Sequence, residues 1–272
     1  MTSNFSPSSG PNRYGSRLWR WIKQGVATGL GAIAFYTCLP MPPSWPLHFA
    51  GIAAWAPAVG VLLGGGLGLI GWALFYAGFS PFLVSILLVS VWIGITGGLH
   101  LDGAMDSADG LAVLDPDRRL EVMADSRSGA FGVMAAILLV LLKVAALTDL
   151  SHGLTWALML AGGWGRWGQL IAIWRYPYLK SEGKGAFHKA AIQSIWQVMP
   201  ASMVLVALSG LLVASQTTTW AIAVAITCCA AGIPFLTGAW FNHKLGGHTG
   251  DSYGAVVEWS EALILCVLTL LL

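Results

Sequence analysis

One charge-free stretch constrains this chain more than any other feature of its sequence. From Gln24 to Leu101 there is no Asp, Glu, Lys or Arg. Soluble domains do not leave so long a segment uncharged, because about a quarter of their residues carry charge. The composition agrees, since 56% of the 272 residues are hydrophobic, 10% are charged and the mean hydropathy is +0.72. We therefore expect a polytopic membrane protein.

Seven apolar segments are long enough to cross a bilayer, which takes about 20 residues of helix. They run over residues 52–76, 81–100, 131–148, 154–174, 198–214, 220–240 and 257–272. The shorter run 26–39 ends at prolines, so we interpret it as a partial or re-entrant segment. The expected fold class is all-α: a polytopic membrane helix bundle with about seven spans plus this partial segment.

The charges that flank these segments indicate how the protein is oriented. Residues 1–25 form a polar tail with Arg13, Arg17, Arg20 and Lys23, and basic flanks favour the cytoplasm. If 26–39 crosses the bilayer, the acidic loop that follows residue 100 lies outside. If it does not, that loop and the basic loop 175–189 share the cytoplasmic side. We prefer the second arrangement, with a cytoplasmic tail (1–25) and an integral membrane domain (26–272).

The segment His100–Gly110 carries the clearest chemical motif. Asp102, Asp106 and Asp109 recur at i, i+4 and i+7, so a helix presents them on one face. Neighbouring anions repel one another, and a divalent cation relieves the repulsion. Oxygen ligands suit Mg²⁺, which often binds through a few carboxylates together with substrate phosphates. The motif predicts a Mg²⁺ site and phosphoryl transfer; the alternative is a solvated helix end decorated with acids.

Residues near this motif are further candidates. His100 is either a substrate contact or an ordinary interfacial histidine. Arg127 has a fork of donors that matches phosphate oxygens, and Asp125 is a candidate metal ligand or base. Alternatively, Asp125 and Arg127 pair with each other and lock their loop.

Later segments add residues whose roles stay open. The loop 175–188, which contains Lys184, mixes cations, glycine and aromatic residues, so it either covers a nucleotide or anchors at lipid headgroups. Asp251 lies close to glycines and could complete a metal or phosphate site. Glu258 and Glu261 are tolerable if they lie near a helix N-terminus, which favours negative charge. Charges inside apolar runs usually face a polar cavity, and two such residues are Lys143 and Arg166.

At these residues the sequence closely resembles the cobalamin synthase family, the adenosylcobinamide-GDP ribazoletransferases. The resemblance covers nearly the whole chain after the tail. Its specific part is the Asp-rich motif followed by Asp-Ser-Arg-x-Gly-Ala-Phe-Gly. The matching pieces are Phe35–Pro40, Pro57–Gly60, Gly98–Gly103 with Asp106 and Asp109-Gly110, Asp125–Arg127 with Gly129–Gly132, and Gly247 with Thr249-Gly250-Asp251 and Gly254-Ala255.

The resemblance implies a Mg²⁺-dependent enzyme of cobalamin biosynthesis. It would join α-ribazole, or its 5′-phosphate, to adenosylcobinamide-GDP and release GMP, in the inner (plasma) membrane of a prokaryote with its active site facing the cytoplasm. The expected metal ligands are Asp102, Asp106 and Asp109. The expected catalytic residues are Arg127, which offsets phosphate charge, and Asp125 or Asp251 as the base. The expected substrate-binding residues are His100, Lys184, Thr249 and Gly250.

The remaining expectations concern partners and rival classes. A net charge of +2 gives no reason to expect a nucleic-acid partner, so the partners are the two substrates and the lipid bilayer, with a homo-oligomer left open. A CDP-alcohol phosphotransferase would carry Asp-Gly-x-x-Ala-Arg, whereas Asp109–Val113 has no Arg in place. A cation transporter would place its acids near the middle of the bilayer.

Overall fold

The chain folds into helices throughout the part that the structure describes. The computed structural model describes residues 13–272 except 151, 182 and 216, and the side chains of residues 13–18 and 184 also lie outside the description. Within these residues no strand forms, which confirms the all-α prediction. The α-helices are α1 (Arg13–Tyr36), α2 (Ala56–Tyr76), α3 (Pro81–Thr96), α4 (Leu99–Ala112), α5 (Arg119–Val122), α6 (Ala130–Asp149), α7 (Leu154–Arg175), α8 (Lys184–Ala191), α9 (Met199–Ala214), α10 (Trp220–Leu245) and α11 (Gly250–Leu268). Short 3₁₀ helices are η1 (Ile52–Trp55), η2 (Pro116–Arg118) and η3 (Ile195–Gln197).

Every segment predicted to cross the membrane contains a helix, but not every helix can span by length and composition alone. Within the described residues, three helical segments are long and apolar enough: Ile52–Tyr76, Ala130–Asp149 and Trp220–Leu245. The bent pair of α3 and α4 makes a fourth if it counts as one span. The others are short or charged, since α9 has 16 residues and α7 and α11 carry buried charges. The full number of seven spans stays a prediction.

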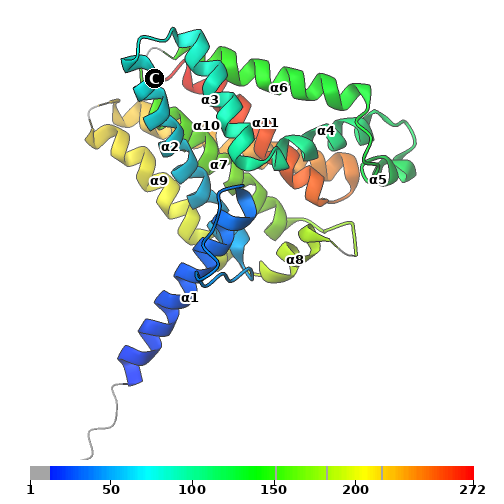
Figure 1. Cartoon of the computed structure of the whole chain (residues 1–272). Helices are drawn as coiled ribbons and strands as arrows, with labels where there is room; N and C mark the ends of the chain where they lie inside the picture. The colour runs from blue at the N-terminus through cyan, green and yellow to red at the C-terminus, as the bar shows by residue number, and fades with distance from the viewer. Residues whose placement is uncertain (1–12, 151, 182, 216) are drawn as a thin grey trace, which may run out of the picture.

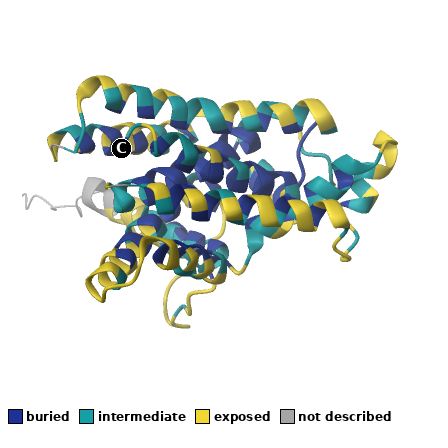
Figure 2. Cartoon of the chain, turned by 90° about the horizontal axis from the view of Figure 1, so that it is seen from above, coloured by how far each residue is buried: buried dark blue, intermediate teal, exposed yellow. Residues whose placement is uncertain are grey.

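The outer surface of the bundle is apolar. Large hydrophobic side chains such as Leu69, Trp72, Leu141 and Leu236 are exposed on it. Figure 2 shows buried residues gathered in the middle of the molecule and exposed residues along its outer faces. Soluble monomers rarely expose apolar surface on this scale, whereas lipid tails cover it readily. The surface therefore supports the membrane assignment.

Glycines at four-residue spacing bring α2 close to α7. Gly60, Gly64 and Gly68 share one face of α2, and a Cβ on Gly64 would collide with the backbone of Leu158. A Cβ on Gly60 would collide with the carbonyl group of Gly162. Small residues at this spacing let membrane helices approach closely and pack well. The α2–α7 pair thus forms a central part of the core.

A sharp bend separates α3 from α4. The two helix axes differ by 90°, and Gly97 and Gly98 at the bend have φ values of 59° and 67°. Glycine adopts these values without the penalty that a side chain would cause. The predicted span 81–100 therefore ends at Thr96. The acid motif belongs to a new helix, α4, which we place outside the spanning segments.

Helix α1 extends away from the bundle, as Figure 1 shows. It is one continuous helix over Arg13–Tyr36, so the predicted boundary at residue 25 falls within it. Its last turns enter the bundle, where Ala32 and Tyr36 are buried. The run expected as a partial segment is therefore the inner end of a longer helix. Residues 1–12 of the predicted tail lie outside the described residues.

Candidate active site

Helix α4 and the start of α11 meet at two glycines. A Cβ on Gly103 would come within 2.5 Å of the backbone oxygen of Asp251. A Cβ on Gly254 would come within 3.0 Å of the backbone oxygen of His100. Because neither glycine carries a side chain, the two helices pack backbone to backbone. This contact brings Asp251 to the acid face of α4.

The structure gathers three carboxylates around that of Asp106. Burial, followed by the charges of Asp102, Asp251 and Asp109, raises the pKa of Asp106 to about 6, while Lys180 acts in the opposite direction. The three aspartates of the motif and Asp251 therefore share one electrostatic environment. Among the described residues, no three His, Cys, Asp or Glu side chains converge closely enough to enclose a metal ion unaided.

Lys180 is the cation of this cluster, and its position depends on a contact between two loops. Its Nζ lies 3.0 Å from Oδ2 of Asp251. The backbone N–H of His248 donates to the carbonyl of Pro177 at 2.9 Å, and that of Leu179 donates to the carbonyl of His248 at 2.8 Å. The loop after α7 is thereby fixed along the loop before α11. The sequence interpretation did not select Lys180, because no local pattern reveals this pairing.

A cavity of about 290 Å³ lies beside the acid cluster. Asp102, Asp251 and Lys180 give it charge, and Gly250 brings the N-terminal end of α11 to its wall. His100, expected as a substrate contact, also lines it and is buried. Further lining residues that the sequence interpretation missed are Tyr36, Gln169 and Tyr253. Tyr178 and His188 also line the cavity, and they belong to the loop 175–188 that the sequence predicts either to cover a nucleotide or to anchor at headgroups.

Asp109 is held by the start of α6. Its carboxylate accepts hydrogen bonds from the backbone N–H of Gly129 at 2.7 Å and of Gly132 at 2.8 Å. The first N–H groups of a helix have no partner within the helix, so Asp109 caps α6 from another helix. A Cβ on either glycine would collide with this carboxylate, which explains both glycines of the motif. Both oxygens are thus engaged, and metal binding by Asp109 stays a prediction.

Asp125 and Arg127 pair with each other at the surface. Nη2 of Arg127 lies 2.6 Å from Oδ2 of Asp125, and the Arg127 side chain is 88% exposed. Hydrogen bonds from Arg127 lower the pKa of Asp125 to about 2. Neither residue is among those that line the cavity. This geometry matches the loop-locking alternative, and a catalytic role for either residue stays a prediction.

The remaining predicted substrate contacts differ in position. Thr249 is buried and caps α11, since its hydroxyl accepts a hydrogen bond from the N–H of Ser252 at 3.2 Å. That hydroxyl also donates to Oδ2 of Asp251 at 3.2 Å. Thr249 does not line the cavity, whereas its neighbour Gly250 does. Lys184 begins α8, but its side chain lies outside the described residues.

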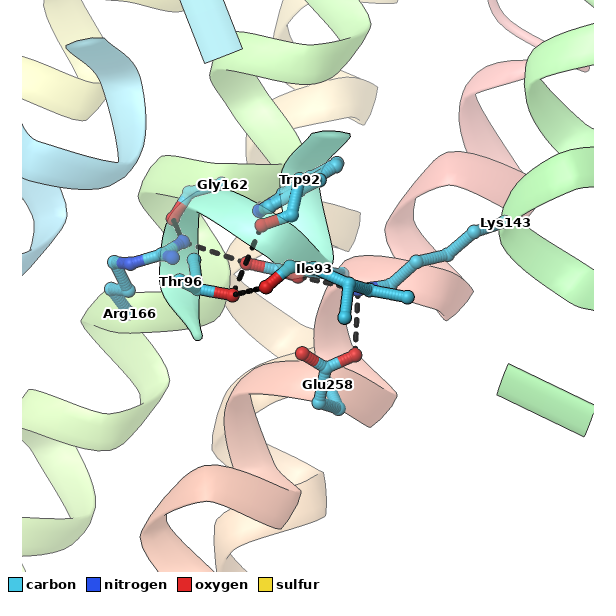
Figure 3. Close-up of polar contacts among 8 residues, drawn as sticks. Trp92, Ile93, Thr96, Lys143, Gly162, Arg166 and Glu258 are labelled. Carbon is cyan, nitrogen blue, oxygen red and sulfur yellow. Dashed lines mark hydrogen bonds and ion pairs between the residues drawn. The ribbon is translucent and has the colours of Figure 1, made fainter. Parts of the chain in front are cut away.

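Two cations and two glutamates form an ion network inside the bundle. Nζ of Lys143 lies 2.7 Å from carboxylate oxygens of both Glu258 and Glu261, and Nη1 of Arg166 lies 2.7 Å from Glu261. Figure 3 shows Lys143 reaching Glu258, and Arg166 close to the carbonyl of Gly162. All four charged residues are buried, and their charges balance, as a low-dielectric interior requires.

This network replaces one explanation from the sequence. Glu258 and Glu261 lie about two to three turns inside α11, which begins at Gly250. The favourable field of a helix N-terminus fades within the first turn, so it does not account for them. Their cationic partners, Lys143 on α6 and Arg166 on α7, account for the two buried glutamates instead.

The fold and the site together define a class of protein. The bundle has a lipid-compatible surface, and it contains a cavity lined by carboxylates, a lysine and a helix N-terminus. These are features of a membrane helix bundle with a charged cavity. The chain belongs to the CobS family, described as Cobalamin-5-phosphate synthase, whose model matches residues 29–269.

Named relatives agree with this family. A protein of Trichormus variabilis (strain ATCC 29413 / PCC 7937) is 54% identical over 242 residues, which is 89% of this chain and 96% of that protein. One from Thermosynechococcus vestitus (strain NIES-2133 / IAM M-273 / BP-1) is 50% identical over 242 residues, 88% and 95% of the two chains. One from Brevibacillus brevis (strain 47 / JCM 6285 / NBRC 100599) is 38% identical over 253 residues, 88% and 96%. All three are named adenosylcobinamide-GDP ribazoletransferase.

These findings confirm the resemblance inferred from the motifs. The chain is an enzyme, a transferase of cobalamin biosynthesis, and neither rival class is needed to explain it. No solved structure matches it significantly.

Proposed function

We propose that this chain joins α-ribazole, or its 5′-phosphate, to adenosylcobinamide-GDP with release of GMP, and that Mg²⁺ is its cofactor. The names of its relatives support the two substrates. The observation that carries the chemistry is the cluster of Asp102, Asp106, Asp251 and Lys180 beside a cavity at the start of α11. Such a cluster provides what phosphoryl transfer requires, which is positioning and control of charge.

The proposed reaction is a displacement at phosphorus. A ribose hydroxyl of the acceptor attacks the phosphorus atom attached to cobinamide and forms a new P–O bond. The P–O bond to the GMP portion breaks, and GMP leaves with the bonding electrons. The proton of the attacking hydroxyl passes to a base on the protein.

The residues around Asp106 fit Mg²⁺ by their chemistry. They provide only oxygen donors, and the raised pKa of Asp106 reports the crowding of anions that a divalent cation would relieve. Magnesium usually binds through one or two carboxylates together with substrate phosphates, so an incomplete protein cluster suffices. A bound Mg²⁺ would neutralise charge on the pyrophosphate oxygens and on the departing GMP. Asp102 and Asp106 are the ligands we propose, with Asp109 fixing α4 against α6.

Lys180, Gly250 and Asp251 have roles that follow from their positions. Lys180 and the N-terminal end of α11, at Gly250, would bind phosphate oxygens, because a helix N-terminus favours anions. Asp251 is the base we propose, since it lines the cavity. Asp125 is a poorer candidate, because its partner Arg127 lowers its pKa to about 2 and a base is most effective when its pKa lies near the working pH.

We also propose that the protein lies in the inner membrane of a prokaryote with this cavity facing the cytoplasm. The support is the basic start of α1, since cytoplasmic flanks carry an excess of Lys and Arg. The inner end of the same helix contributes Phe35 and Tyr36 to the cavity.

A transfer assay tests the proposed function. The full-length protein in lipid is incubated with adenosylcobinamide-GDP and either form of the acceptor, and GMP and the joined corrinoid are measured together. We expect equal amounts of the two products. Folded protein that forms neither product with either acceptor would refute the proposal, and CDP-linked substrates would then be tested.

A further inference from the structure

The cavity contains a buried part lined by aromatic rings, which the phosphate chemistry does not use. Tyr36, His100, His188 and Tyr253 line it, and no more than 3% of any of them is exposed. They come from α1, α4, α8 and α11, so four helices far apart in the sequence converge here. The charged residues of the same cavity are more accessible, since Lys180 and Asp251 keep 33% and 25% of their side chains exposed.

Several polar atoms of this buried part have no partner among the described residues. They are Nε2 of His100, both ring nitrogens of His188 and the hydroxyl of Tyr253. A buried polar atom left unpaired costs about 1–3 kcal/mol, so native proteins usually pair such atoms with protein, water or ligand. Because three residues in one cavity have buried polar atoms that lack a hydrogen-bond partner, we expect a polar ligand there.

The electrostatics indicate a neutral ligand group rather than an anion. Burial lowers the pKa of His188 to about 4. The His188 ring is therefore neutral at pH 7, and it offers one donor and one acceptor. The phosphates of a nucleotide would instead lie toward Lys180 and the start of α11.

The walls are flat. The rings of Tyr36 and His188 are stacked, with centroids 6.2 Å apart and planes inclined by 11°. Tyr178 and Tyr253 form a second stacked pair, with centroids 5.9 Å apart. Stacked aromatic walls with polar atoms suit a planar heteroaromatic base, which enzymes hold by stacking and by hydrogen bonds to its edges.

We propose that this part of the cavity binds the guanine base of the GDP-linked donor, an inference that rests on the proposed function. Guanine presents N7 and O6 as acceptors and an amino group as donor, so it can pair with several neutral residues at once. The base of α-ribazole has one free ring nitrogen and an otherwise apolar edge. The volume, about 290 Å³, is close to the lower end of the range for small-ligand pockets, which suits a single base.

Two variants that keep a ring test the proposal. Tyr253→Phe removes a hydroxyl, and His188→Phe removes the ring nitrogens. We expect each to raise the KM for adenosylcobinamide-GDP and the dissociation constant for GMP roughly fivefold to tenfold, which corresponds to one lost hydrogen bond. The KM for α-ribazole stays unchanged. The control is Ser260→Ala, which removes another buried, unpaired hydroxyl of α11 outside the cavity and should change none of these values.

GMP binding, measured by equilibrium dialysis, separates this inference from the proposed function. If wild-type protein binds GMP, the variants weaken it and no transfer occurs, then the inference holds and the proposed function is wrong. If transfer occurs but the variants match Ser260→Ala, the inference is wrong. A higher KM for α-ribazole with an unchanged KM for the donor also overturns it and assigns the pocket to the acceptor.

Discussion

Asp109 of α4 accepts a hydrogen bond from the backbone N–H of Gly129, just before α6, at 2.7 Å. The second hydrogen bond, from Gly132, makes the carboxylate a cap for a helix that is not its own. The acid motif and the Gly-Ala-Phe-Gly motif are therefore two halves of one structural unit, because a side chain on either glycine would displace the carboxylate.

Replacing Gly132 with alanine tests this unit. Its Cβ would collide with the Asp109 carboxylate, so Gly132→Ala should lower the free energy of unfolding by at least about 1 kcal/mol, the usual value of a helix cap. Thermal unfolding in lipid nanodiscs measures the change. Gly66→Ala is the matched control, because a Cβ there meets no neighbour and alanine favours helix. Equal stability of the two variants would contradict the capping role.

The buried ion network predicts unequal effects of two similar substitutions. Glu261 pairs with both Lys143 and Arg166, whereas Glu258 pairs with Lys143 alone. Glu261→Gln leaves Arg166 without its carboxylate, and a loss of about 3–5 kcal/mol is expected when a buried pair is broken. Glu258→Gln should cost clearly less, because Lys143 keeps Glu261. Urea or thermal unfolding measures the loss of stability in both variants. Equal losses of unfolding free energy would contradict these unequal roles of the two glutamates.

The proposed base predicts different behaviour for two aspartates. Asp251→Asn should lower kcat about 10²-fold to 10⁴-fold, as loss of a general base does. Asp125→Asn should leave the shape of the pH profile between about pH 5 and 9 unchanged. Because the folded pKa of Asp125 is depressed to about 2, its stabilising effect is present above the ordinary pKa of about 4 and is lost only as the pH falls toward 2. If the pH–rate profile of Asp125→Asn no longer falls at low pH, Asp125 is the base instead.

Local patterns in the sequence revealed the helices and the acid motif. The segment predicted over 154–174 forms α7 at Leu154–Arg175, because a continuous apolar run between turn residues can be recognised without its neighbours. The spacing of Asp102, Asp106 and Asp109 likewise needs only the helical repeat.

Contacts between distant segments could not be predicted in the same way. Lys180 reaches Asp251 only because two loops exchange backbone hydrogen bonds, and Lys143 meets Glu258 only because α6 packs against α11. The end of the span at Thr96 depends on the positive φ of two glycines, whereas apolarity alone continues past them. These contacts and this bend depend on the three-dimensional arrangement of the chain, which residue type and local spacing do not reveal.

The most direct test of the central claim is the dependence of GMP release on Mg²⁺ in wild-type protein and in Asp106→Asn. The account predicts that EDTA abolishes GMP release by wild type and that added Mg²⁺ restores it. It also predicts that Asp106→Asn stays folded in the membrane, loses nearly all activity at every Mg²⁺ concentration and is no longer stabilised against heat by Mg²⁺. Activity close to wild type in Asp106→Asn, or full activity in EDTA, would contradict the account.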